Sequence, residues 1–185
     1  MIEKGQLEID DSAGCTVWFK HKLTAPVLIE YIATLISNNG KNDRVSDLNC
    51  FWMATDPEYP EDMFLNSKAR KGKFSNYHCL RLYYIGYGAN NNTTTRFRRY
   101  PGDCSRPLIQ GFEDKDHMNI PNAARKIQII STGKSVIFIC DGEIVFHFND
   151  ACPFTEGWFG FRTVNNHMKI DNFKIHSIVV KQDDE

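Results

Sequence analysis

The chain is 185 residues long, which is enough to bury one sizeable hydrophobic core and short for two domains. Its formal net charge of -1 at pH 7 excludes the broad basic surface with which proteins bind nucleic acid or an anionic membrane. No apolar run approaches the roughly 18 residues that a membrane-spanning helix requires. We therefore expect a single domain over residues 1–185, with neither nucleic acid nor membrane as a partner.

Helical periodicity is nearly absent, and short β-rich runs recur about every ten residues, which is typical of an all-β sandwich or barrel. The predicted strands, in chain order, are 6–9, 14–20, 27–34, 48–54, 79–87, 94–100, 125–131, 135–140, 143–148, 157–163 and 168–180. Residues 56–73 and 101–122 are predicted as long loops, the first with a helical turn near 61–66. Loops of this length in a compact domain usually carry function.

Two glycine-containing dipeptides connect three successive predicted strands. Thr132-Gly133 and Asp141-Gly142 are predicted as two-residue hairpin turns, because glycine adopts the positive φ that such turns demand. The three strands from 125 to 148 should therefore form a meander.

The six cysteines include no Cys-x-x-Cys pair and no histidine at zinc-finger spacing, so a structural zinc site is not expected. Four lie inside apolar or aromatic runs and are predicted to be buried thiols, because free cysteine packs like a small core residue: Cys15, Cys50, Cys79 and Cys140. Cys104 and Cys152 lie in predicted loops and could pair with each other.

Residues 83–100 hold four tyrosines, three arginines and a polar Asn/Thr turn, in the pattern of a β-hairpin. Aromatic rings can stack on sugar rings, and the arginine fork makes bidentate hydrogen bonds to carboxylates. This combination is typical of a surface that recognises an acidic carbohydrate. The simpler interpretation is an aromatic hairpin with solvated arginines.

Side chains alternate between the two faces of a strand, so the strand patterns assign residues to faces. If Phe97 points into the core, then Arg96, Arg98 and Tyr100 line the outer face of the sheet.

The preceding strand is assigned by its leucines. Placing Leu80 and Leu82 in the core puts Arg81, Tyr83 and Tyr87 on the outer face, unless a bulge at one of the nearby glycines inverts the order.

The segment 157–163 repeats this logic. Phe159 and Phe161 form a core side, which leaves Trp158 and Arg162 on the outer face, and His167 follows on the turn into the last strand. The glycine between Trp158 and Arg162 leaves room for a ligand against the backbone.

In the strand 48–54, either Asn49 and Phe51 or Cys50 and Trp52 belong to the outer face, and only one pair can be right.

These motifs together resemble a family of bacterial domains of unknown function in the concanavalin A-like lectin/glucanase superfamily. The resemblance rests on residues 47–52, 72–78, the hairpin 83–100 and 157–173. It implies a two-sheet antiparallel jelly-roll sandwich with a concave glycan-binding sheet, and it places Arg162 and His167 on that face. Domains of this kind occur with polysaccharide-degradation genes and usually carry an export signal. We therefore expect a periplasmic or extracellular location, although this chain shows no such signal.

The first functional hypothesis is a polysaccharide lyase that cleaves uronic-acid-containing glycans by β-elimination. The reaction needs a cation or hydrogen bonds at the uronate carboxylate, a base for the acidified proton and an acid for the leaving oxygen. The substrate-binding candidates are Asn49, Trp52, Tyr87, Arg96, Arg98, Trp158 and Arg162. The acid–base candidates are His78, His167, Tyr84 and Tyr100.

The alternative is a non-catalytic carbohydrate-binding domain that uses the same arginine-rich and aromatic face. A third hypothesis, an accessory domain that only packs on a partner enzyme, would require an apolar outer face. Glycoside hydrolysis is not indicated, because it needs paired carboxylates and the acidic residues gather in loops. No cofactor is expected, although scattered Asp and Asn residues leave room for a structural calcium ion. The expected partner is an acidic oligo- or polysaccharide.

Overall fold

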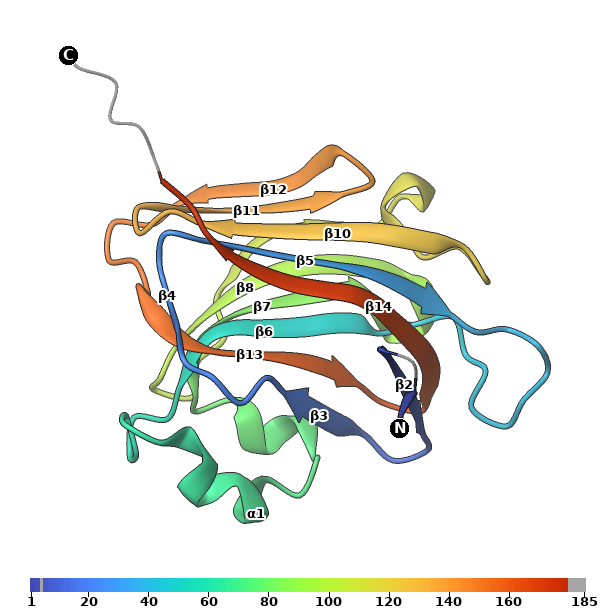
Figure 1. The fold of residues 1–185 in the computed structure, drawn as a ribbon, viewed down its shortest axis with the longest axis horizontal. Coiled ribbons are helices and arrows are strands. Elements are labelled where there is room, and N and C mark those ends of the chain that lie inside the picture. The colour runs from blue at the N-terminus through green and yellow to red at the C-terminus, as the bar shows by residue number, and fades with distance from the viewer. Residues whose placement is uncertain (4, 180–185) are drawn as a thin grey trace.

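The computed structural model describes residues 1–3 and 5–179, which form two antiparallel sheets packed face to face (Figure 1). The first, which we call the β5 sheet, has the strand order β1-β2-β14-β5-β10-β11-β12. Its strands are β1 (Ile2–Glu3), β2 (Gln6–Asp11), β14 (Asn166–Ser177), β5 (Val27–Leu35), β10 (Ala124–Ser131), β11 (Ser135–Cys140) and β12 (Glu143–Asn149).

The second sheet, which we call the β6 sheet, has the order β3-β13-β6-β7-β8-β9, with β4 beside β13. Its strands are β3 (Cys15–Trp18), β4 (Leu23–Thr24), β13 (Glu156–Thr163), β6 (Leu48–Thr55), β7 (Arg81–Gly88), β8 (Thr94–Pro101) and β9 (Leu108–Phe112). The short helical elements are η1 (Met63–Asn66), α1 (Ser67–Arg70), η2 (Phe74–Tyr77), α2 (Ala89–Asn92) and η3 (Lys115–His117). The predicted two-sheet antiparallel sandwich is confirmed.

Every predicted strand has a counterpart whose ends are shifted by a few residues, and η1 matches the helical turn expected near 61–66. Residue 180, the predicted end of the last strand, lies outside the described residues. The sequence pattern misses β1, β4 and β9. The last of these lies inside the expected loop 101–122, and as a mostly exposed strand at the sheet edge it shows no alternation of apolar and polar residues.

The predicted meander forms through two tight turns. Asp141 and Gly142 have φ values of 52° and 90°, and they join Cys140 to its cross-strand partner Glu143 as predicted. In the other turn, Thr132 N donates a hydrogen bond of 2.9 Å to the Ser135 carbonyl, so the centre of the turn lies one residue later than predicted.

The core between the sheets is built from alternate residues. Along β5, every second side chain from Val27 to Leu35 is buried between the sheets. Phe97, Phe159 and Phe161 pack there from the β6 sheet, as predicted. Cys50 and Trp52 also point inward, which assigns Asn49 and Phe51 to the outer face.

Two candidate binding residues lie in the core and not on the outer face. Tyr87 was expected on the outer face, and Trp52 belonged to one of the two alternatives for it, but both are 1% exposed and pack between the sheets. Tyr83 packs there as well, while Leu82 lies on the outer face. The prediction took the leucine side of β7 for the only apolar side.

The outer face of the β6 sheet carries a second apolar cluster, because residues 56–80 fold over it. We call these residues the cover segment. Figure 1 shows α1, which belongs to it, lying beyond β3 and β13 on the side away from the β5 sheet. The members of the cluster are Phe51, Ala54, Met63, Tyr77, Leu80, Leu82, Tyr84, Tyr100 and Trp158, with Trp18, Phe64 and Phe74 packed against them. Both faces of the central strands are thus apolar.

The cover segment is held by an internal ion pair and by a disulfide. Near its start, Asp56 forms a buried ion pair of 3.0 Å with Arg70. Near its end, Cys79 forms a disulfide with Cys104, which lies in the loop after β8. The prediction that Cys79 is a free thiol is therefore wrong, and so is the suggested pairing of Cys104 with Cys152, which is free and exposed.

Candidate functional site

The cover segment leaves one end of the outer face open, and a cavity of about 380 Å³ lies there. Its wall is shared by the β6 sheet, the cover segment and the turn between β7 and β8. The lining residues are Ala13, Gly14, Asp47, Asn49, Lys71, Gly72, Lys73, Phe74, Tyr84, Ala89, Asn90, Arg162 and Val164. We call this cavity the outer-face pocket.

Arg162 is the central charged group of the pocket. It projects from the outer face of β13 and is only 2% exposed. Its Nη1 donates a hydrogen bond of 2.6 Å to the Gly72 carbonyl, and its guanidinium lies over the rings of Phe74 and Tyr77 at 5.4 and 5.3 Å. Burial lowers the pKa of Arg162. No carboxylate within the described residues forms a salt bridge with it.

The wall that contacts Arg162 is a left-handed turn at the end of α1. Lys71 and Gly72 have φ values of 48° and 68°, and this ends the helix. A Cβ on Gly72 would overlap the backbone oxygen of Gly14, so only glycine fits here. The turn exposes the side chains of Lys71 and Lys73 at the rim of the pocket.

The floor of the pocket is polar where Asn49 stands beside Arg162, its cross-strand partner on β13. Asn49 is 5% exposed and donates a hydrogen bond of 3.2 Å from Nδ2 to Asp47. Its Oδ1 is buried and has no hydrogen-bond partner among the described residues. Asp47 is held by Ser46 and by an ion pair with Arg44. Asn49 therefore offers a free hydrogen-bond acceptor, whereas Asp47, the acidic residue of the pocket, is already paired.

Tyr84 and Phe74 form the aromatic side of the pocket. Their rings lie 5.4 Å apart, and both contact Phe51 beneath them. The hydroxyl of Tyr84 lies over Gly86, since a Cβ on that glycine would be 2.8 Å from it. Burial raises the pKa of Tyr84 well above its usual value.

Two predicted arginines occupy the outer face of β8, next to this pocket. Arg96 makes an exposed ion pair of 3.2 Å with Glu113, and Arg98 donates a hydrogen bond of 2.6 Å to the Arg106 carbonyl. The prediction that Arg96, Arg98 and Tyr100 share the outer face is confirmed.

Three further candidates lie beneath or within the cover segment. Trp158 packs edge-on against Phe64 at 5.6 Å, and Tyr100 is fully buried beside Tyr84. His78, at the end of the segment, contacts the rings of Phe74 and Tyr100, and burial lowers its pKa. Trp158 and Tyr100 are on the outer face, as predicted, but neither is open to a ligand.

His167 is on the wrong sheet to act with Arg162. It belongs to β14 of the β5 sheet, where its Nδ1 is 2.8 Å from Asp43 and its Nε2 is 2.7 Å from Glu8. The prediction that it joins the concave face is therefore wrong, because the turn after β13 carries the chain from one sheet to the other.

Four pocket residues were not predicted from the sequence, namely Asp47, Lys71, Lys73 and Phe74. The loop residues show no periodicity that could assign them to a face. For Asp47, Lys73 and Phe74 the available signal was the family-like motif, because residues 47–52 and 72–78 both belong to it, whereas Lys71 lies just outside it.

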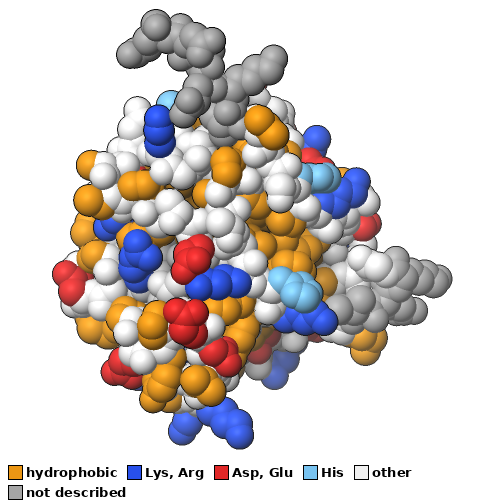
Figure 2. All heavy atoms as spheres, turned by 60° about the vertical axis from the view of Figure 1, so that its left-hand side comes forward, with side chains coloured by type: hydrophobic (Ala, Val, Ile, Leu, Met, Phe, Trp, Pro, Cys, Tyr) orange, Lys and Arg blue, Asp and Glu red, His pale blue; other side chains and the backbone are white. Residues whose placement is uncertain are grey.

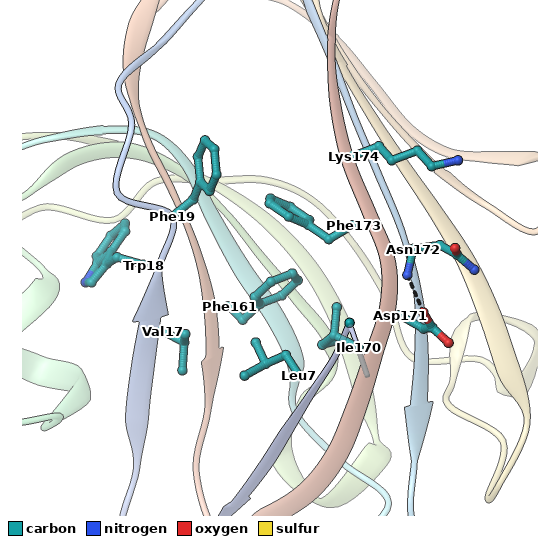
Figure 3. A pocket seen from close by; sticks show the side chains of 11 residues that line it. Leu7, Val17, Trp18, Phe19, Phe161, Ile170, Asp171, Asn172, Phe173 and Lys174 are labelled. Carbon is teal, nitrogen blue, oxygen red and sulfur yellow. Dashed lines mark hydrogen bonds between the residues drawn. The ribbon is translucent and has the colours of Figure 1, made fainter. Parts of the chain in front are cut away.

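A second cavity, of about 560 Å³, opens at the edge of the sandwich between β3, β13 and β14 (Figure 3). Phe19, Phe161 and Phe173 surround it with aliphatic side chains. Asn172 and Lys174 extend away from these rings in Figure 3, and the backbone N–H of Asn172 donates a hydrogen bond of 2.7 Å to Asp171 Oδ1. The polar lining side chains of this cavity are those of Trp18, Asp171, Asn172 and Lys174, and none of its described lining residues is an arginine.

The charges elsewhere on the molecule are mixed. On the face drawn in Figure 2, acidic and basic side chains are interspersed, in keeping with the net charge of -1. None of the helices between residues 5 and 179 is long and apolar enough to span a membrane. Within the same residues, no group of three or more His, Cys, Asp or Glu side chains is arranged to hold a metal ion.

Comparison with protein families matches residues 9–173 to the family described as "Domain of unknown function (DUF6250)". A search of the curated proteins finds no match.

Several solved structures share the fold. A Bacillus subtilis protein of unknown function with a galectin-like fold has 18% identity and a TM-score of 0.74, over 96% of this chain and 86% of the other. The carbohydrate-binding module CBM66 from Bacillus subtilis has 12% identity and a TM-score of 0.62, over 92% and 86%. The metal-free carbohydrate recognition domain of Emp46p has 10% identity and a TM-score of 0.62, over 96% and 85%. These likenesses confirm the predicted jelly-roll architecture.

Proposed function

The chain belongs to the DUF6250 family of domains of unknown function, and we propose that it is a carbohydrate-binding domain whose outer-face pocket takes an acidic sugar. Two of the similar structures are named as carbohydrate-binding or carbohydrate-recognition domains, which supports the class of ligand. The nature of the sugar is argued from this chain's own side chains.

The observation that carries the proposal is the buried guanidinium of Arg162. Removing a charged group from water costs several kcal/mol unless an opposite charge compensates it. Within the described residues, Arg162 has only carbonyl, hydroxyl and ring partners, and Lys71 and Lys73 add two more positive charges nearby. A carboxylate on the ligand would provide the missing charge, and arginine binds carboxylates in a bidentate manner.

The remaining groups suit the rest of a sugar. The free Oδ1 of Asn49 can accept a hydrogen bond from a hydroxyl group, which would relieve an otherwise unpaired buried acceptor. The rings of Phe74 and Tyr84 offer apolar surfaces against which a pyranose can pack.

Binding is favoured over β-elimination because none of the four predicted acid–base residues is placed to act as a base beside Arg162. His167 is on the other sheet and His78 is enclosed by Phe74 and Tyr100. Burial raises the pKa of Tyr84 and of Tyr100, which makes their ionised forms scarce near neutral pH. We place the domain outside the cytoplasm, since a disulfide such as Cys79–Cys104 persists in oxidising compartments.

The test is calorimetric titration with a panel of uronic-acid oligosaccharides and their neutral counterparts. We expect the acidic ligands to bind more tightly, and the double variant Lys71→Gln, Lys73→Gln to weaken binding several-fold without unfolding the domain, because both side chains are exposed. Lys126→Gln, an exposed lysine on the β5 sheet, is the matched control. Asn49→Ala should weaken the binding of acidic and neutral ligands alike.

Two results would overturn the proposal. One is the absence of binding to every acidic glycan in the panel. The other is the appearance of an unsaturated uronate product, followed by its ultraviolet absorbance, which would establish a lyase instead.

A further inference from the structure

Four cross-strand positions, three of them polar, stand in a row across the outer face of the β6 sheet. The strand registers pair Arg162 on β13 with Asn49 on β6, Asn49 with Gly86 on β7, and Gly86 with Arg96 on β8. Cross-strand partners point to the same face, so the row begins in the outer-face pocket and ends at Arg96.

The space that a side chain would fill above Gly86 is taken by a neighbouring tyrosine. The Tyr84 hydroxyl lies over Gly86, so the third position also presents a polar group, between Asn49 and Arg96. The row therefore reads guanidinium, amide, phenol and guanidinium. At about 4.8 Å between neighbouring strands, the two arginine backbones are roughly 14 Å apart, which is longer than a single sugar ring.

Arg96 is held only loosely in the free protein. Its ion pair with Glu113 is 3.2 Å long, and the side chains are 34% and 74% exposed. Exposed pairs of this kind contribute little stability, so an incoming carboxylate can replace Glu113. Arg98 is on the same face of the same strand and adds positive charge beside Arg96.

We propose that the saccharide site extends from the outer-face pocket along this row, and that Arg96 binds a second acidic group two or more ring positions along the ligand. The ligand class is then an oligosaccharide with repeated uronic acids, and Glu113 is an internal competitor for Arg96. This inference rests on the proposed function, because the first acidic sugar must occupy the pocket.

The experiment is a titration of the full chain with a uronic-acid monomer, dimer, trimer and tetramer. Affinity should rise by about tenfold once the ligand is long enough to reach Arg96, in line with one added charge-assisted contact. Arg96→Gln should abolish this rise and leave the affinity for the shortest binding oligomer unchanged. Glu113→Gln should strengthen binding of the longer oligomers several-fold, whereas Glu143→Gln, an exposed glutamate on β12, should not.

The two possible failures are distinct. If no oligomer binds to wild type, the proposed function itself is wrong. Alternatively, oligomers bind and the Lys71→Gln, Lys73→Gln variant weakens their binding, but Arg96→Gln and Glu113→Gln leave the affinity unchanged at every ligand length. In that case the pocket is the whole site and the extension is wrong. Both variants alter exposed or half-exposed side chains, and unchanged thermal unfolding verifies that they fold.

Discussion

Arg162 and Gly72 are joined by a hydrogen bond of 2.6 Å between the guanidinium Nη1 and the backbone carbonyl, which ties β13 to the cover segment at the wall of the outer-face pocket. The same guanidinium lies over the rings of Phe74 and Tyr77. Arg162 therefore supports the shape of the pocket as well as its charge. Substituting it would change both at once, so the tests below rely on other residues.

The first prediction concerns the turn that Arg162 holds. Gly72→Ala should destabilise the domain by about 1–3 kcal/mol, because alanine is strained at positive φ and its Cβ would overlap the Gly14 backbone. It should also weaken saccharide binding, since Lys71 and Lys73 flank the turn. Urea unfolding and calorimetric titration measure the two effects.

Gly142→Ala is the control for this substitution. Gly142 has a φ of 90°, but a Cβ there would meet no atom within 4 Å. It should show only the cost of the backbone strain and leave binding intact. Equal losses of stability in the two variants would mean that the contact with Gly14 has no energetic role.

The second prediction concerns the apolar cluster under the cover segment. Leu82 is fully buried on the outer face of β7, so Leu82→Ala should cost about 2–5 kcal/mol, as in other large-to-small core substitutions. Leu65→Ala, in the cover segment but 69% exposed, should change the free energy of unfolding by less than about 0.5 kcal/mol. If urea unfolding shows only a small loss of stability for Leu82→Ala, the cover segment does not bury this face.

This cluster explains why the faces of one strand could not be predicted from the sequence. Alternation assigned β8 correctly, because its outer face carries arginines opposite Phe97. In β7 both faces are apolar, since Leu82 packs under the cover segment and Tyr83 packs between the sheets. A period of two shows which residues share a face, but it cannot show which face meets the larger core.

The candidate site was predictable to the extent that strands carry it. Arg96 and Arg162 follow from alternation on two strands, and Asn49 belongs to one of the two alternatives that alternation left open on a third. The structure brings the three residues into one row. Lys71 and Lys73 come from a loop, where no periodicity fixes a direction. His167 was misplaced because closeness in sequence to Arg162 was taken as closeness in space, although the intervening turn crosses between the sheets.

The third prediction concerns the disulfide that closes the cover segment. Cys79 and Cys104 are 25 residues apart in the chain, and removing a cross-link of this length costs about 2–4 kcal/mol. Cys104→Ser should therefore lower the thermal midpoint, and reductant should lower that of wild type to a similar value. Cys152→Ser removes an exposed free thiol and should unfold like wild type. A wild-type midpoint that is insensitive to reductant would contradict the predicted role of the cross-link.

The last prediction concerns pH and the His167 cluster of the β5 sheet. Burial lowers the pKa of His167, but the hydrogen bonds that its ring donates to Glu8 and Asp43 outweigh burial, and the net pKa is raised. The pKa of Glu8 is lowered, chiefly by its hydrogen bond with His167. A raised histidine pKa stabilises the fold below the unfolded value of about 6.5, and this stabilisation is lost as pH rises through the folded value. The lowered Glu8 pKa acts in the opposite direction, and its contribution is lost as pH falls below about 4.3.

His167→Gln should therefore destabilise the domain at about pH 5.5 more than at about pH 8, because only the protonated imidazole gains from both carboxylates. The measurement is the urea midpoint of wild type and variant at both pH values. His147→Gln, an exposed histidine on β12, should show no such difference. A His167→Gln penalty that is equal at the two pH values would mean that His167 acts through packing alone, and not through its charge.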